Sequence, residues 1–276
     1  MLHRFNQAVG ALFDLFFFPF REMNPWVGFT AATLLTAVLM LLAYRFASNQ
    51  RGIHLTKDRI SAYLLEVRLY RDDPLTVLRA QALLLAYNLR YLGHSLVPFL
   101  VLMVPLALVL VQMDLRFGRR ALAPSETAIV KIRLEPDRKP TTLSVTLDST
   151  PGLAVETPPL RIDTEAEINW RIRAIRIGSH TLWAGVGAET GEIQVEVYRA
   201  GLSLLPATRV RTGVIDQLLN PGLPPLPVSS AIRRMEVDYP ARSMPIFGLK
   251  LHWIIPFFLL TFLLGLSLKG LFRIEM

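Results

Sequence analysis

Three long apolar stretches alternate with polar segments along the chain. They are Val27–Phe46, Tyr91–Met113 and Leu251–Leu268, and Arg45 is their single charged residue. A helix rises about 1.5 Å per residue, so about 20 apolar residues cover the roughly 30 Å hydrocarbon core of a bilayer. The pattern therefore predicts three transmembrane helices, of which the third is marginal in length.

A charged helical segment separates the first two apolar stretches, and its turn signals lie at Arg71–Pro74. Asp72 and Asp73 can cap a helix N-terminus, and Pro74 suits the first helical position. We therefore predict two helices that turn back on each other at Arg71, Asp72, Asp73 and Pro74. Because both ends of this hairpin run into predicted spans, it should project from one side of the membrane.

The first 24 residues show helical periodicity. Apolar side chains share one helical face: Phe5, Val9, Leu12, Phe13, Phe16 and Phe20. Gln7, Gly10 and Asp14 lie on the opposite face, which predicts an amphipathic helix in the membrane interface. We expect four aromatic residues to contact that interface: Phe13, Phe16, Phe20 and Trp26. No small-x-small cleavage site follows the apolar run, so we do not expect a cleaved signal peptide.

From Ser125 onward the apolar period changes from helical to two. One such run alternates Val130, Ile132 and Leu134 with Lys131 and Arg133. Similar runs follow at 143–147, 168–173 and 193–197, and turn residues separate them. This pattern is typical of an antiparallel, immunoglobulin-like β-sandwich of about seven strands. Residues 201–230 are rich in proline and leucine, and we expect a loop or a lid there.

The fold class that follows is a membrane α-helical protein with an inserted all-β sandwich domain outside the cytoplasm. We expect these segments: interfacial helix 1–24, first span 25–47, cytoplasmic helical hairpin 48–90, second span 91–114, β-sandwich domain 117–247, third span 248–270 and cytoplasmic tail 271–276.

Composition and charge support membrane placement and set the expected orientation. The chain is 52% hydrophobic, with a mean hydropathy of +0.38, a net charge of +8 and a pI near 10.1. Seven basic residues lie in the hairpin segment, and basic residues near span ends favour the cytoplasmic side. We therefore expect a bacterial inner-membrane protein with its N-terminus outside, its C-terminus inside and its β-domain periplasmic or extracellular. The basic residues flank predicted spans, so lipid headgroups explain them better than nucleic acid does.

Candidate catalytic chemistry is sparse. The chain has no cysteine, no phosphate-binding loop, no HExxH and no Gly-x-Ser-x-Gly motif. Gly185, Gly187 and Gly191 lie between two predicted strands with no helix after them, so a hairpin turn explains them better than a nucleotide site. We expect no enzyme activity, no cofactor, no metal and no small-molecule substrate.

The order of the predicted elements, with hairpin residues 56–90 running into the PFLVLMVP stretch at 98–105, resembles the three-span members of the YidC/Oxa/Alb insertase superfamily. The resemblance covers roughly residues 1–120 and 250–270. It implies a groove, open to cytoplasm and lipid, that inserts transmembrane segments of nascent membrane proteins. It also implies that the hairpin tip meets the incoming chain or a ribosome.

Carried onto this chain, the resemblance places five residues along the groove: Thr30, Thr33, Thr36, Arg45 and Gln112. A second interpretation is that the threonines bond to carbonyls of the preceding turn and pack between helices. The competing functional hypothesis is a non-catalytic, membrane-anchored subunit of an envelope complex, whose β-sandwich binds a membrane or periplasmic partner. An insertase needs the threonines to face a water-accessible cavity, whereas an anchor would bury them.

Overall fold

The computed structural model describes residues 2–48, 50–187, 189–198, 202, 204–211, 213–246, 248–268 and 270. The chain divides into two compact units. Unit 1 comprises Met1–Phe29 and Leu110–Pro256, and unit 2 comprises Thr30–Val109 and Phe257–Met276. The expected cytoplasmic tail, residues 271–276, lies outside the described residues.

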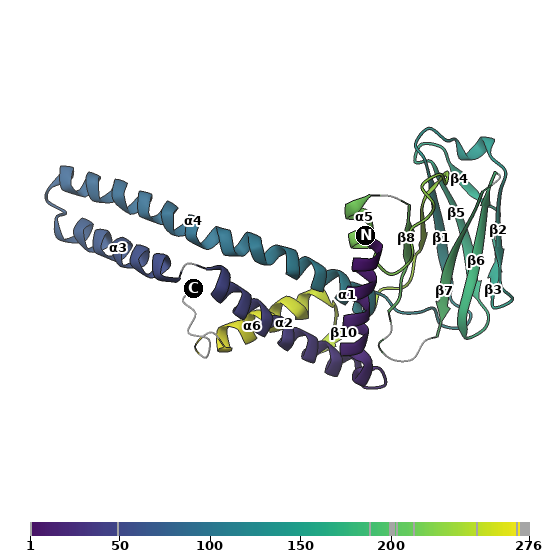
Figure 1. The fold of residues 1–276 in the computed structure, drawn as a ribbon, viewed down its shortest axis with the longest axis horizontal. Helices are drawn as coiled ribbons and strands as arrows, with labels where there is room; N and C mark the ends of the chain where they lie inside the picture. Colours follow the sequence, from purple (N-terminus) through teal and green to yellow (C-terminus); the bar gives the residue numbers. More distant parts are fainter. Residues whose placement is uncertain are drawn as a thin grey trace. The chain divides into compact units, whose positions relative to one another are not determined.

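Unit 2 is helical and contains most of the apolar stretches (Figure 1). Its helices are α2 (Pro25–Ala47), α3 (Gln50–Leu69), α4 (Pro74–Met113) and α6 (Ile254–Leu268), of which α2, α4 and α6 extend into unit 1. Two described helices are long and apolar enough to cross a membrane: α2, and α4 with its continuation to Gly118. The second hairpin arm and the second predicted span therefore form one uninterrupted 40-residue helix.

The third apolar helix is shorter than the sequence pattern indicates. Helix α6 begins at Ile254 and has 15 residues, because Leu249–His252 forms strand β11 and pairs with β10 (Ser243–Ile246). At about 1.5 Å per residue it is about 22 Å long, less than the roughly 30 Å hydrocarbon thickness.

The helical hairpin forms where its turn residues predict it. Asp73 caps α4, accepting hydrogen bonds from the Leu75 amide (3.2 Å) and the Thr76 hydroxyl (2.6 Å). The two arms pack through the Tyr63 and Tyr87 rings, whose centroids are 5.4 Å apart. Ala80 of α4 is fully buried.

Unit 1 contains two main β-sheets (Figure 1) besides the β10-β11 pair. The buried side chains of the two main sheets form one hydrophobic cluster. The larger sheet has the strand order β3-β5-β1-β9-β8, with β4 also paired to β5; the smaller has the order β2-β6-β7. The strands of the larger sheet are β1 (Thr127–Leu134), β3 (Leu153–Val155), β4 (Leu160–Ile162), β5 (Glu167–Ala174), β8 (Thr208–Val210) and β9 (Ile232–Val237). Those of the smaller sheet are β2 (Val145–Ser149), β6 (Gly178–Val186) and β7 (Glu189–Val197).

The alternating pattern correctly identifies the core of these sheets. Strands β1 and β5 pair antiparallel with Val130 opposite Trp170, and both side chains are buried. Strands β6 and β7 pair up to Val186 and Glu189, and Gly187 has φ +61°, so the glycine-rich segment is a hairpin turn as predicted. The 201–230 segment, which we expected to be a loop or lid, contains β8 and the short helix α5 (Val214–Leu219). Strand β8 is ordered there because it pairs with β9.

Candidate functional site

Unit 2 contains an open, almost wholly apolar cavity of about 230 Å³. Residues of α2, α4 and α6 line it: Ala37, Met40, Leu41, Tyr44, Leu102, Thr261, Phe262, Gly265 and Leu266. Tyr44 and Thr261 are its polar lining residues, and the buried Thr261 hydroxyl has no hydrogen-bond partner within the described part of the chain. The cavity can hold one or two large apolar side chains or part of an acyl chain, but it is too small for a helix.

The threonine stripe does not line this cavity. Thr33 and Thr36 are buried, and the Thr36 hydroxyl donates to the Ala32 carbonyl at 2.7 Å. Thr30 and Arg45 are exposed. Thr36 thus bonds to the preceding turn of its own helix, as the packing interpretation predicts for this threonine. The groove role of the stripe stays a prediction.

The residues at the hairpin tip are accessible. Arg71, Asp72, Asp73 and Pro74 are all exposed, and the Arg71 and Asp72 side chains lie 3.9 Å apart. The hydrogen bond from the Thr76 side chain is the main reason that the pKa of Asp73 is lowered. The tip can therefore present charge to a partner, although its role in docking stays a prediction.

Gln112 belongs to a buried polar cluster in unit 1 rather than to a groove. The Arg116 side chain is 1% exposed and donates from Nη1 to Gln112 Oε1 (2.8 Å) and from Nη2 to Asp14 Oδ1 (2.6 Å). Its guanidinium also lies over the Phe13 and Phe17 rings, 5.8 and 5.4 Å from their centroids. These hydrogen bonds and the aromatic faces offset the cost of burying this charge.

The turn that carries Arg116 is a π-helix, Asp114–Gly118, at the end of α4. The Trp253 indole donates to Asp114 Oδ1 at 3.1 Å, which joins this turn to the segment before α6. A Cβ at Gly118 would come within 2.3 Å of Asp114 Oδ1, so a larger residue there would displace the Asp114 carboxylate. Sequence reasoning missed the cluster, because Arg116 sits just beyond a predicted span and resembles an ordinary flanking charge.

The N-terminal helix α1 (Leu2–Phe17) packs a mixed face of polar and aromatic residues against the rest of unit 1. Asn6 is buried and its side-chain amide donates to the Gln217 carbonyl of α5 at 2.8 Å, so α1 lies beside α5 (Figure 1). Asp14 reaches the buried Arg116. Large apolar residues remain exposed on α1 and just after it: Phe5, Leu12, Leu15 and Phe18. The predicted helix is therefore present, whereas its placement in a membrane interface stays a prediction.

The four expected interface aromatics are only partly accessible. Phe13, Phe16, Phe20 and Trp26 are each half-buried. Phe16 packs against Phe17 and Phe20, and Phe13 stacks on Phe17. Part of each ring is therefore committed to contacts within unit 1.

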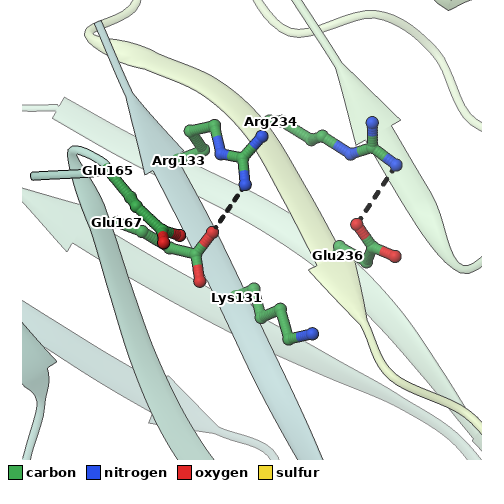
Figure 2. Close-up of a pocket in the computed structure, with 6 residues that line it drawn as sticks. All are labelled: Lys131, Arg133, Glu165, Glu167, Arg234 and Glu236. Carbon is green, nitrogen blue, oxygen red and sulfur yellow. Dashed lines mark hydrogen bonds and ion pairs between the residues drawn. The ribbon is translucent and has the colours of Figure 1, made fainter. Parts of the chain in front are cut away.

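A charged hollow of about 210 Å³ lies on the larger sheet (Figure 2). Figure 2 shows Arg133 paired with Glu167 at 2.9 Å and Arg234 paired with Glu236 at 3.1 Å, beside Lys131 and Glu165. Burial disfavours ionisation of Glu167, but hydrogen bonds from Asn169 and Arg133 outweigh it and lower its pKa. This balanced face suits a mixed-charge protein surface better than a single ion.

Among the described residues, no group of three or more histidine, aspartate or glutamate side chains could hold a metal ion. No protein-family model matches the sequence, and a comparison with curated proteins finds no match. Two solved structures show weak similarity. Domains 4 and 5 of the S-layer protein SbsC are 20% identical over 30% of this chain and 48% of that one, with a TM-score of 0.22. The larger S-layer fragment rSbsC(31–844) is 17% identical over 36% of this chain and 14% of that one, with a TM-score of 0.21. The chain thus spans less than half the length of either S-layer chain.

Proposed function

We propose that this chain is a membrane-protein biogenesis factor of the YidC/Oxa/Alb type, with an added immunoglobulin-like β-sandwich domain outside the cytoplasm. The observation that carries the proposal is the open apolar cavity formed by α2, α4 and α6. The element order supports it: an amphipathic helix, an apolar helix, a helical hairpin that continues into a second apolar helix, and a third apolar helix after the β-domain.

The cavity changes the mechanism that the resemblance implies. Its lining is apolar, so it suits the apolar side chains of a client helix that lies across its mouth. Tyr44 can hydrogen-bond a client's polar group, which lowers the cost of several kcal/mol that such a group pays in hydrocarbon. Because α6 is about 22 Å long, the bilayer would thin beside it and shorten the client's path.

Site-specific photo-crosslinking tests this proposal. A photo-reactive residue at Phe262, which lines the cavity and is 63% exposed, should capture newly synthesised membrane proteins. The matched control is Leu263, which is 50% exposed and does not line the cavity. We expect at least a five-fold excess of client crosslinks from Phe262. Equal capture from both positions, or capture that does not depend on translation, would contradict the proposal.

A second candidate is a membrane-anchored subunit whose β-domain binds a partner outside the cytoplasm. The burial of Thr33 and Thr36 favours this candidate, because an anchor packs such residues between helices. The charged hollow of Figure 2 supplies a binding face. Lys131→Glu with Arg234→Glu should then release a stably co-purifying partner, whereas the exposed control Arg176→Glu should not. Retention of the same partners by both variants would exclude this face.

A further inference from the structure

Helix α4 carries an apolar stripe with a seven-residue period that no other described residue of unit 2 covers. The stripe, here called the leucine seam, comprises Leu75, Leu78, Ala82, Leu85, Leu89, Leu92, Leu96, Phe99 and Met103. Leu78 and Leu85 are 65% and 64% exposed, and every other leucine of the seam is exposed as well. Helix α3 packs on a different face of α4, through Ala80 and Tyr87.

Lipid cannot cover the first half of this seam in a membrane-anchored chain. Helix α4 has 40 residues and is therefore about 60 Å long, twice the roughly 30 Å hydrocarbon core. The apolar span starts near Tyr91, so Leu75–Leu89 lies before it. Exposed leucines at this density mark a protein interface.

The spacing of the seam identifies the kind of occupant. Intervals of three and four residues, repeated over four heptads, put apolar residues at both core positions of a coiled coil. Binding clients of varying sequence does not require such a regular period. Pairing with another helix of the same period does require it, because apolar residues must meet at every turn. A second copy of α4 provides that helix in the same orientation, because both copies enter the same bilayer from the same side.

Charge and area are both compatible with parallel pairing of two copies. In register, Gln81 of one copy faces Ala86 of the other and Asn88 faces Gly93, so the flanks bring no like charges together. Nine seam side chains from each copy would bury on the order of 1,000 Å² of apolar surface between the two helices, which reaches the size of a specific interface. The five that lie before the span would leave water, and the other four would leave lipid.

We propose that the leucine seam of α4 is a parallel homodimer interface. This inference rests on the membrane anchoring in the proposed function, which fixes the parallel direction. It does not depend on client binding at the cavity.

Cysteine crosslinking tests the inference directly, because the chain has no native cysteine. Full-length Leu78→Cys and Leu85→Cys variants are oxidised in native membranes, with Leu64→Cys as the control. Leu64 is on α3, outside the seam, and is 54% exposed. We expect a disulfide-linked dimer at both seam positions, at least five-fold above the control. Dimer yields equal to the control, or a dimer at Leu85 without one at Leu78, would overturn parallel pairing.

Co-purification of two differently tagged copies supplies a second readout. The double variant Leu78→Asp with Leu85→Asp should reduce recovery of the second tag at least ten-fold, whereas Leu64→Asp should leave it unchanged. Circular dichroism of each purified variant checks that the helices remain. An unchanged recovery in the folded double variant overturns the interface. Crosslinking of clients from Phe262 is scored separately, so failure of the dimer and failure of the proposed function are distinguishable.

Discussion

The β-sheets of unit 1 bury their apolar side chains, whereas helix α4 of unit 2 leaves a row of them exposed. In β1 and β5, Val130, Ile132, Ile168 and Ile172 are fully buried in a core made by the chain itself. In α4, the leucine seam stays exposed. Burial of apolar surface is the main driving force of folding, so the chain itself covers the sheet core of unit 1, whereas the seam of α4 needs lipid or another protein to cover it.

The same contrast predicts where truncation of an apolar side chain lowers the free energy of unfolding most. Ile132→Ala leaves a cavity in the shared core of the two sheets and should lower the free energy of unfolding of unit 1 by about 2–5 kcal/mol. Leu85→Ala, on the exposed seam, should change it by less than about 0.5 kcal/mol. Urea unfolding of the detergent-solubilised full chain, followed by the fluorescence of its four tryptophans, measures both. Similar costs for the two variants would remove the distinction between the units.

The next largest effect should come from the single buried charge that joins α1 to the π-helix. Arg116→Met leaves the buried Gln112 oxygen and the Asp14 carboxylate without their donor, which should cost about 2–3 kcal/mol. Arg119→Met removes a partly exposed ion pair of 3.9 Å and should cost less than about 1 kcal/mol. Hydrogen exchange of Leu2–Phe17 is the readout. If α1 keeps full protection in Arg116→Met, the polar cluster does not hold that helix.

Local patterns allowed much of this architecture to be predicted. Alternation along Val130–Leu134 identified a core strand, because side-chain direction in a strand depends only on position along the chain. Asp73 and Pro74 correctly located the start of α4, because a cap acts within three residues. These signals need no knowledge of distant partners.

Features that depend on distant residues were not predictable from the same patterns. Arg116 contacts Asp14, which lies 102 positions away, so nothing near Arg116 distinguishes it from a flanking charge. Leu249–His252 reads as the start of an apolar helix until β10 pairs with it. The threonine stripe suggested a groove, but Thr36 bonds to its own helix. Its polarity was visible in the sequence, whereas its environment was not.

Tyr239 supplies a buried polar group in the core of unit 1, and its contribution to stability can be measured. Its hydroxyl accepts the Glu196 amide at 2.9 Å, so Tyr239→Phe should cost about 1 kcal/mol. Burial raises the pKa of Tyr239 above the ordinary value of 10.0. The unfolded chain therefore loses this proton first as pH rises, and the native state loses stability above about pH 10. The difference in unfolding midpoint between the native chain and Tyr239→Phe should be smaller at pH 11 than at pH 8. An equal difference at both pH values would contradict this.

The smallest expected effect concerns a surface pair in unit 1 at the entrance to β1. The Glu126 carboxylate accepts hydrogen bonds from both terminal nitrogens of Arg120 and from the Ala123 amide, each at 2.8 Å. The hydrogen bond from Arg120 is the main reason that the pKa of Glu126 is lowered. A carboxyl with a lowered native pKa stabilises the fold above its unfolded pKa, near 4.5, and loses this contribution as pH falls further. Because the pair is partly exposed, Glu126→Gln should cost less than about 1 kcal/mol at pH 7. Its unfolding free energy should approach that of the native chain near pH 3, as measured by urea titration at both values. Asp58, an exposed acid of the hairpin in unit 2, supplies the control. Asp58→Asn should leave the unfolding free energy of unit 1 unchanged at pH 7 and at pH 3.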